Sequence, residues 1–206
     1  MELFTVKADA AAEFVEKKSV FTGRVFYVPD IPEAEKRIAA LKKEFSGATH
    51  NVWAYRLQGG AQQRYSDDGE PQGTAGVPVL SVLENSGLTN VLCVVTRYFG
   101  GVLLGAGGLV RAYSRAASLS LEAAGRARLV QMAEFSAECP YSQSKTLLHY
   151  LEKYGAENIS AGYTDKVLVT AFIEDRRYGE LEHALTSALY HGLVLRKKNA
   201  GLSRKT

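Results

Sequence analysis

Two segments decide how the rest of the sequence is interpreted: SDDGEPQGTAG at Ser66–Gly76 and RYFGGVLLGAGGLVRAYSR at Arg97–Arg115. The first, the acidic loop (residues 66–76), places three carboxylates within four residues and then a short run that can open a helix. The second holds the end of an apolar strand, the glycine loop (residues 99–108) and a helix with basic side chains. Several glycines close together indicate backbone with positive φ or a close approach between two backbone segments. The free N–H groups at the start of a helix attract anions. We therefore expect a binding site at these two loops.

The polar residues and glycines of these segments are the candidate binding residues. They are Asp67, Asp68, Glu70, Thr74, Arg97, Tyr98, Gly100, Gly101, Gly105, Gly107, Gly108 and Arg111. The three carboxylates are compatible with a Mg²⁺ ion that also holds substrate phosphates, or with ion pairs to arginines that would join the two loops. The glycines match neither the dinucleotide fingerprint nor the Walker motif. They leave open a looser anion site and, equally, tight packing of the helix on a sheet.

Two other chemistries find less support in the residues. A hydrolase triad could be assembled from Ser66, His50 and an aspartate, but no Gly-x-Ser-x-Gly motif surrounds the serine. We therefore predict no catalytic residue. No RNP-type strand or helix-turn-helix motif is present, although Tyr98 and Phe99 beside Arg97 are suited either to stacking on a base or to anchoring the loop.

Composition sets limits on function and cellular location. The 206 residues are 46% hydrophobic and 23% charged with a net charge of +3, which is ordinary for a soluble globular protein and permits contact with RNA. The two cysteines, Cys93 and Cys139, form no CxxC motif, so we predict no structural metal site, no cofactor and a reducing cytoplasm. No window approaches the ~18 apolar residues of a membrane span, so we expect no membrane partner.

Residues 1–128 read as alternating strands and helices around the two loops. Residues 12–28 predict one or two strands with a break at Lys17-Lys18, and a helix follows Asp30, which suits an N-cap with Glu33 completing a capping box. The further expected elements are a strand at Thr49–Leu57, a strand at Gln62–Tyr65, a helix at Thr74–Glu84, a strand at Val91–Tyr98 and a helix at Leu109–Ala124.

Residues 129–206 show a different order after a boundary expected at Gly125–Leu129. Strands are predicted at Val130–Glu138, Glu157–Tyr163, Val167–Glu174 and Leu193–Lys197, and helices at Tyr141–Tyr154 and Arg177–Tyr190. This βαββαβ order is that of a ferredoxin-like domain. The fold class expected for the chain is therefore α+β with two domains, 1–128 and 129–206.

The two loops also carry a family resemblance. DDGEPQGTAGVP and VVTRYFGGVLLGAGGLVRAY, with KKSVF at Lys17–Phe21 and HNVWA at His50–Ala54, resemble the signature of the IMPACT/YigZ family, and the short N-terminus resembles its bacterial branch. The resemblance is close over residues 10–125. Carried over position by position, it adds Lys18, Ser19 and His50 to the candidate binding residues.

The resemblance implies a fold for each domain and a role in translation. The first domain would be an α/β sandwich similar to a small-subunit ribosomal protein and to domain IV of elongation factor G, and the second similar to that factor's ferredoxin-like domain V. Our leading hypothesis is a cytoplasmic regulatory or accessory protein that binds RNA, the ribosome or a translation factor through the two loops, without catalysis. The alternatives are a Mg²⁺-dependent enzyme acting on a phosphorylated small molecule and a protein-interaction module. The residues leave the oligomeric state open.

Overall fold

The computed structural model describes residues 2–189 and 191–205, which form an α+β protein with two antiparallel sheets. The chain divides into two compact units, the first running up to Leu129 and the second covering Val130–Ser203. The expectation of an α+β protein is therefore confirmed. Both loops that attracted attention in the sequence lie in the first unit.

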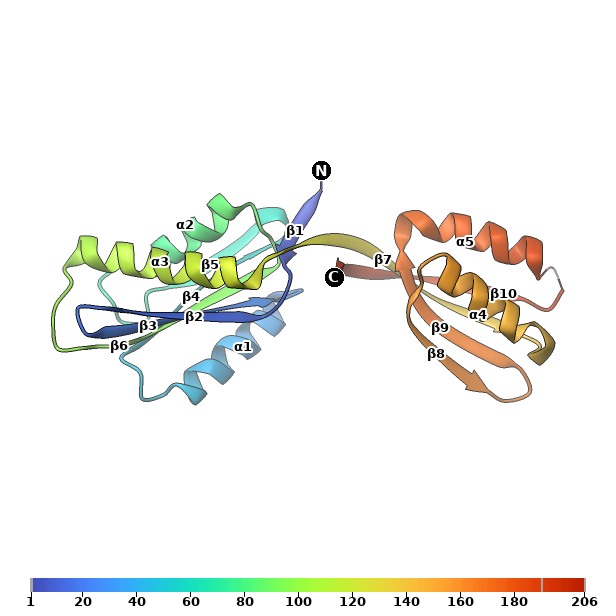
Figure 1. Ribbon diagram of the computed structural model, residues 1–206, viewed down its shortest axis with the longest axis horizontal. Coiled ribbons are helices and arrows are strands. Elements are labelled where there is room, and N and C mark those ends of the chain that lie inside the picture. The colour runs from blue at the N-terminus through green and yellow to red at the C-terminus, as the bar shows by residue number, and fades with distance from the viewer. Residues whose placement is uncertain (1, 190, 206) are drawn as a thin grey trace. The chain divides into compact units, whose positions relative to one another are not determined.

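The first unit is built on a five-stranded sheet with the order β2-β3-β6-β4-β5 (Figure 1). The bounds of these strands are β2 Ala10–Glu16, β3 Ser19–Tyr27, β4 His50–Leu57, β5 Gln62–Ser66 and β6 Val91–Tyr98. Helix α1 (Ile31–Glu44) covers one face of the sheet, and helices α2 (Gly76–Ser86) and α3 (Ala106–Ala124) cover the other. A short strand, β1 (Leu3–Val6), pairs with residues 126–129 of the chain.

Strand β6 lies at the centre of this sheet and is buried on both faces, as its nearly continuous apolar sequence predicts. Side chains alternate between the two faces of a strand. Cys93 and Val95 accordingly pack under α2 and α3, whereas Leu92 and Val94 pack under α1. The same alternation directs Arg97 toward α2 and α3.

Two local sequence signals of the first unit are confirmed. Strands β2 and β3 form a hairpin whose turn residues, Lys17 and Lys18, have φ values of 44° and 66°. Two consecutive turn residues with positive φ give the chain the twist that matches the two strands of a hairpin. Helix α1 begins after Asp30, whose Oδ1 accepts a hydrogen bond of 2.9 Å from the Glu33 amide. The Glu33 carboxylate does not complete the capping box in the described part of the chain, because it pairs with Lys36 and Arg37 instead.

The starts of two helices differ from the prediction. Helix α2 begins at Gly76 rather than Thr74, because the Thr74 amide is held in a turn by the Pro71 carbonyl at 3.0 Å. Helix α3 begins at Ala106 rather than Leu109, and the Leu109 amide donates to the Gly105 carbonyl at 3.0 Å to close the first turn. The two glycines of that turn lower helix propensity without preventing the helix.

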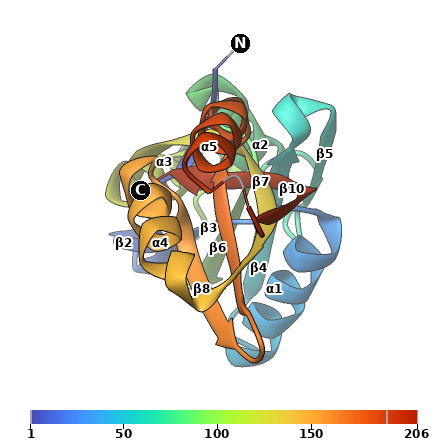
Figure 2. The ribbon, with the colours of Figure 1, turned by 90° about the vertical axis from the view of Figure 1, so that its right-hand side faces the viewer.

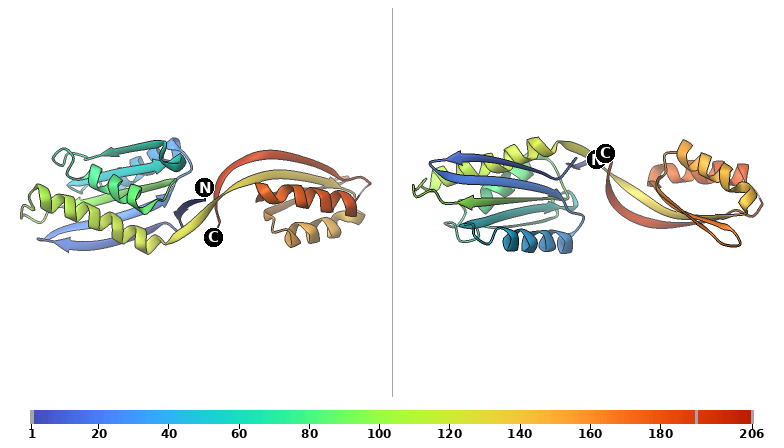
Figure 3. Two further views of the ribbon diagram at one scale, coloured as in Figure 1. Left: turned by 90° about the horizontal axis from the view of Figure 1, so that it is seen from above. Right: turned by 60° about the horizontal axis from the view of Figure 1, so that its bottom comes forward.

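The second unit contains strands paired in the order β10-β7-β9-β8, with both helices packed on one face of the sheet (Figures 2 and 3). The bounds are β7 Arg126–Cys139, α4 Ser144–Lys153, β8 Glu157–Tyr163, β9 Val167–Glu174, α5 Asp175–Ala188 and β10 Val194–Lys205. Strand β10 continues well beyond the predicted end at Lys197, because it pairs with the long strand β7. The predicted last helical residue, Tyr190, lies outside the described residues. Within the described part of the chain, no helix is long and apolar enough to cross a membrane.

The close contact between β3 and α3 makes Gly23 a sensitive position. A Cβ at Gly23 would lie 2.4 Å from the backbone oxygen of Ala116 in α3. We expect Gly23→Ala to lower the free energy of unfolding by about 1–3 kcal/mol through overpacking. Urea unfolding followed by the fluorescence of Trp53, the single tryptophan, reports on this unit. Gly47→Ala is the matched control, because a Cβ there meets nothing within 4 Å, and an equal loss in both variants would contradict the packing argument.

Both cysteines are free thiols and buried, which predicts low reactivity. Burial raises the pKa of the Cys93 thiol to about 12 and also raises the pKa of Cys139. Because the thiolate is the reactive form, the native protein should react slowly with a disulfide reagent at pH 8, and faster only as the pH approaches these raised pKa values. Absorbance should report two rapidly reacting thiols in guanidinium chloride. Rapid reaction of Cys93 in the native state at pH 8 would contradict its burial.

Candidate functional site

The candidate site begins with two facing residues on neighbouring strands. His50 at the start of β4 is the register partner of Arg97 near the end of β6. Both side chains point to the face covered by α2 and α3, in the same alternating series as Val52 and Val95. The Arg97 side chain is only 5% exposed, so its charge needs a buried partner.

Glu70 of the acidic loop supplies that partner. Its Oε1 accepts a hydrogen bond of 2.6 Å from Arg97 Nη1 and another of 2.7 Å from the Tyr113 hydroxyl of α3. The carboxylate is 4% exposed, so the pair is removed from water and relies on these hydrogen bonds for compensation. Burial, together with the acceptor Glu70, raises the pKa of Tyr113, which keeps the phenol protonated as a donor. The acidic loop, β6 and α3 therefore meet at one oxygen atom.

His50 lies beside Glu70 and Arg97, and among the described residues only one of its two ring nitrogens makes a hydrogen bond. Nδ1 lies 2.8 Å from the Asp68 carbonyl oxygen, which only accepts, so Nδ1 carries the proton. Nε2 lies 3.7 Å from Glu70 Oε1, beyond hydrogen-bond distance. The imidazole is thus oriented by the backbone of the acidic loop.

The other two carboxylates of the acidic loop have separate structural roles. Asp67 accepts hydrogen bonds from the amides of Gly73, Ala75 and Gly76, and so caps helix α2 from nine residues away. Asp68 has a φ of 47° and turns its carboxylate away to other partners. Its Oδ2 accepts from the Asn51 amide at 2.6 Å and its Oδ1 pairs with Lys42 at 2.5 Å.

These contacts decide between the two interpretations of the carboxylates. Pairing with an arginine is confirmed for Glu70 alone, whereas Asp68 pairs with a lysine and Asp67 with backbone amides. The oxygens that a Mg²⁺ ion would need are therefore directed at different partners. In residues 2–189 and 191–205, no three His, Cys, Asp or Glu side chains gather as they would around a metal.

The glycine loop is pinned against the β2–β3 turn. A Cβ at Gly100 would lie 2.0 Å from the backbone carbon and oxygen of Lys18, so only glycine fits there. The Gly100 amide donates to Ser19 Oγ at 3.1 Å, and the same oxygen lies 3.4 Å from Arg97 Nη2. Lys18 and Ser19 thus help to place the loop through backbone approach and a shared hydroxyl group.

Helix α3 begins beside this loop with glycines and no capping side chain. Gly105 occupies the N-cap position with a φ of 73°, a region that favours glycine. No side chain caps this end of the helix, and its first turn contains no acidic residue. Gly107 and Gly108 follow, and the exposed Arg111 lies one turn further along.

Between the acidic loop, the glycine loop and the start of α3 lies an open pocket of about 440 Å³. Its polar part consists of Thr49, His50, Glu70 and Arg97, and its apolar part includes Pro71, Phe99, Leu103, Leu104 and Leu109. Gly69, Gly105 and Ala106 contribute backbone. A mostly apolar pocket with a few converging polar groups is typical of a small-molecule or cofactor site.

The structure brings most of the sequence-predicted residues to this end of the first unit. His50, Glu70, Arg97 and Gly105 line the pocket. The others near it act through the backbone or on adjoining elements, and they are Lys18, Ser19, Asp67, Asp68, Thr74, Gly100, Gly101, Gly107, Gly108 and Arg111.

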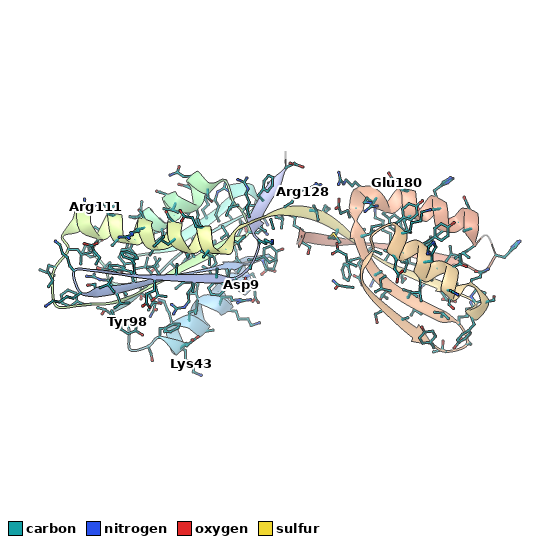
Figure 4. The ribbon with its side chains drawn as sticks, viewed as in Figure 1. Asp9, Lys43, Tyr98, Arg111, Arg128 and Glu180 are labelled. Carbon is teal, nitrogen blue, oxygen red and sulfur yellow. The ribbon has the colours of Figure 1, made fainter. Side chains whose placement is uncertain are left out.

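Tyr98 is the exception, because it lies on the α1 face of the sheet, away from α3 and Arg111 (Figure 4). Alternation along β6 places it opposite to Arg97. Its neighbour Phe99, which we paired with it as a stacking residue, does line the pocket.

Tyr113 is the site residue that sequence reasoning missed. It lies in the buried stripe of α3 with 0% exposure. A buried tyrosine hydroxyl generally has a hydrogen-bond partner, so its position signalled a buried polar contact. Nothing in the sequence identified Glu70 as that partner.

Comparison with known proteins places this site in a described family. The Impact N-terminal domain matches residues 17–121, a range that contains the whole pocket. The chain belongs to the IMPACT family. An IMPACT family member of Haemophilus influenzae is 32% identical to it over 203 residues, covering 97% of this chain and 98% of that protein.

Two further comparisons extend the similarity along the chain. The IMPACT family member YigZ of Escherichia coli is 31% identical over 172 residues, covering 82% of this chain and 84% of YigZ. A solved structure described as that of a hypothetical protein aligns with a TM-score of 0.66 and 28% identity, over 94% of this chain and 96% of that one. The expected resemblance to bacterial members of the IMPACT family is therefore confirmed over most of the chain.

The buried pair predicts an asymmetric response to removing a carboxylate. Glu70→Gln would leave the Arg97 charge buried without a counter-charge, so we expect a loss of about 3–5 kcal/mol in the free energy of unfolding. Glu35→Gln is the matched control, because Glu35 pairs with Arg64 at the surface with side-chain exposures of 60% and 65%. That change should cost about 0–1 kcal/mol. Similar losses in both variants, measured by urea unfolding, would refute the importance of the buried pair.

Proposed function

We propose that this IMPACT family member is a cytoplasmic accessory protein of translation that binds RNA at the end of the first unit where the two loops meet. The observation that carries the proposal is the pocket between the acidic and glycine loops, with the uncapped start of α3 at its wall. Helix N-termini of this kind attract phosphate groups. Phosphate contacts supply most of the sequence-independent affinity for nucleic acids.

A second hollow beside the pocket supports RNA over an uncharged ligand. It has a volume of about 250 Å³ and shares Leu104 with the pocket. Its charged residues are Lys17, Arg111 and Arg115, with a single acidic residue, Glu16. This local excess of positive charge occurs in a chain whose net charge is only +3. We define the basic rim as Lys17, Arg111 and Arg115.

Exposed aromatic and apolar side chains at the pocket suit the bases of a single strand. Phe99 is 45% exposed, and the Arg97 guanidinium lies 5.4 Å from its ring centroid. Stacking on aromatic rings is worth about 1–3 kcal/mol per base and tolerates any sequence. The basic rim would follow the backbone while Phe99 receives a base.

The association with translation rests on fold likeness and is a proposal of its own. The strand order β10-β7-β9-β8 with two helices on one face fits a ferredoxin-like arrangement. We propose that the two units correspond to domains similar to domains IV and V of elongation factor G. Fold likeness alone does not establish function, so the RNA contact is the part to test first.

Fluorescence anisotropy with a labelled single-stranded RNA tests the basic rim. We expect Arg111→Ala/Arg115→Ala to weaken binding at least tenfold. Loss of two phosphate contacts should also lower the slope of log affinity against log salt by about 1.4. The matched control is Lys36→Ala/Lys43→Ala, which removes two exposed charges from α1 on the other face of the sheet.

Two results would overturn the proposal. One is equal RNA affinity in the wild type and the Arg111→Ala/Arg115→Ala variant of unchanged thermal stability. The other is capture from cytosol of a protein partner that survives RNase and is lost in the same variant, which would support a protein-interaction module.

A further inference from the structure

The first turn of α3 concentrates positive charge without an anion to balance it. Its free amides belong to Ala106, Gly107 and Gly108, which donate to no acceptor among the described residues. The helix is 19 residues long, so its N-terminus carries a substantial share of the helix dipole. An acidic or hydroxyl side chain would normally occupy the capping position, which here is Gly105.

Arg111 adds a second positive charge at the same place. Its Nη1 lies 3.5 Å from the position that a Cβ of Gly107 would occupy, so the guanidinium folds back over the first turn. Within the described part of the chain, it makes no ion pair or hydrogen bond. A cation at a helix N-terminus is unfavourable unless an anion joins it.

Arg97 holds a buried donor without an acceptor beside the same pocket. The residue is 4% exposed and lines the pocket, yet its Nε–H is buried with no acceptor in the described structure. Buried donors are almost always satisfied, and an orphan of this kind calls for an explanation. An anion at the start of α3 would meet the open helix end and the Arg111 guanidinium, whereas Arg97, which lines the pocket, is already paired with Glu70.

We propose that the pocket binds the terminal phosphate of a nucleotide, with the phosphate at the amides of Ala106–Gly108 and the base against Phe99. The inference rests on the same site as the proposed RNA binding and names its ligand. The nucleotide is either free or the end of an RNA strand, since both present the same phosphate monoester.

The donors favour a terminal phosphate over an internal one. A phosphate monoester has three free oxygens and carries about −1.5 to −2 charges at pH 7, which matches three free amides and a nearby guanidinium. An internal phosphodiester offers only two free oxygens and one charge. Gly107 and Gly108 have no side chains between the amides and an approaching oxygen.

The apolar wall favours a nucleotide over inorganic phosphate. Leu103 is 82% exposed and Phe99 45%, and both line the pocket next to the helix end. The volume of about 440 Å³ lies within the range of small-molecule sites. A base resting on these side chains would cover apolar surface that now faces water.

Isothermal titration calorimetry with AMP, adenosine and inorganic phosphate tests the ligand chemistry. We expect AMP to bind at least tenfold more tightly than either adenosine or phosphate, because only AMP engages both the helix end and the apolar wall. Affinity for AMP equal to that for adenosine would overturn the phosphate assignment. No binding of AMP at all would overturn the inference.

Gly107→Asp tests the position of the phosphate without endangering the fold. The new Cβ meets only the flexible end of Arg111, and a carboxylate there complements the helix dipole and pairs with Arg111. We expect a melting temperature equal to or above that of the wild type, together with at least a tenfold loss of AMP affinity. Gly107→Asn is the matched control of equal size without the charge, and it should lose less. Undiminished AMP binding by Gly107→Asp would place the phosphate elsewhere.

Two RNAs of one sequence, with a 5′-phosphate or a 5′-hydroxyl end, separate the sources of the nucleotide. Preference for the phosphorylated end, abolished by Gly107→Asp, supports the RNA end. Tight AMP binding with no such preference supports a free nucleotide. RNA binding that depends on Arg111 and Arg115 without any AMP binding would overturn this inference while leaving the proposed RNA function intact. AMP binding without RNA binding would do the reverse.

Discussion

The Glu70 carboxylate is the group on which the candidate site depends. It joins Arg97 of β6 and Tyr113 of α3 to the acidic loop, and His50 of β4 lies beside it. These segments are far apart in sequence, and their contacts fix where both loops leave the sheet. A buried ion pair contributes little net stability, but breaking it leaves an uncompensated charge. The pair therefore constrains the shape of the pocket more strongly than it raises the overall stability of the first unit.

Periodicity predicted most of the elements because burial on a sheet or helix face is a local pattern. Strand β6 was predicted with its observed bounds, and the helix expected at Leu109–Ala124 ends at the observed last residue of α3. The predictions failed at the starts of α2 and α3. There, the hydrogen bond that the Gly76 amide donates to Asp67, nine residues earlier, and the backbone angle of Gly105 set the first helical residue. Such contacts cannot be read from residue spacing.

The sequence predicted that two loops form the candidate site, but it did not predict that the three carboxylates of the acidic loop have different roles. The three adjacent carboxylates look equivalent in the sequence, yet only Glu70 faces the pocket, because Asp67 caps a helix and Asp68 holds β4. This division shows that the carboxylates hold the acidic loop to its neighbours, as in the ion-pair alternative, with a lysine and backbone amides as well as an arginine. Similarly, Tyr98 and Phe99 are neighbours in sequence but end on different sides, since Tyr98 still belongs to the alternating strand.

The start of α3 is the point where the first unit leaves backbone amides without a capping side chain. A serine or aspartate at an N-cap is better than glycine by only a few tenths of a kcal/mol, and the φ of 73° at Gly105 would strain any other residue. The unpaired Arg111 adds to the positive charge of the same turn. Glu70, whose charge would oppose an incoming anion, is already neutralised by Arg97. The pocket thus keeps its acidic residue occupied and its amides open, which is the arrangement that an anionic ligand requires.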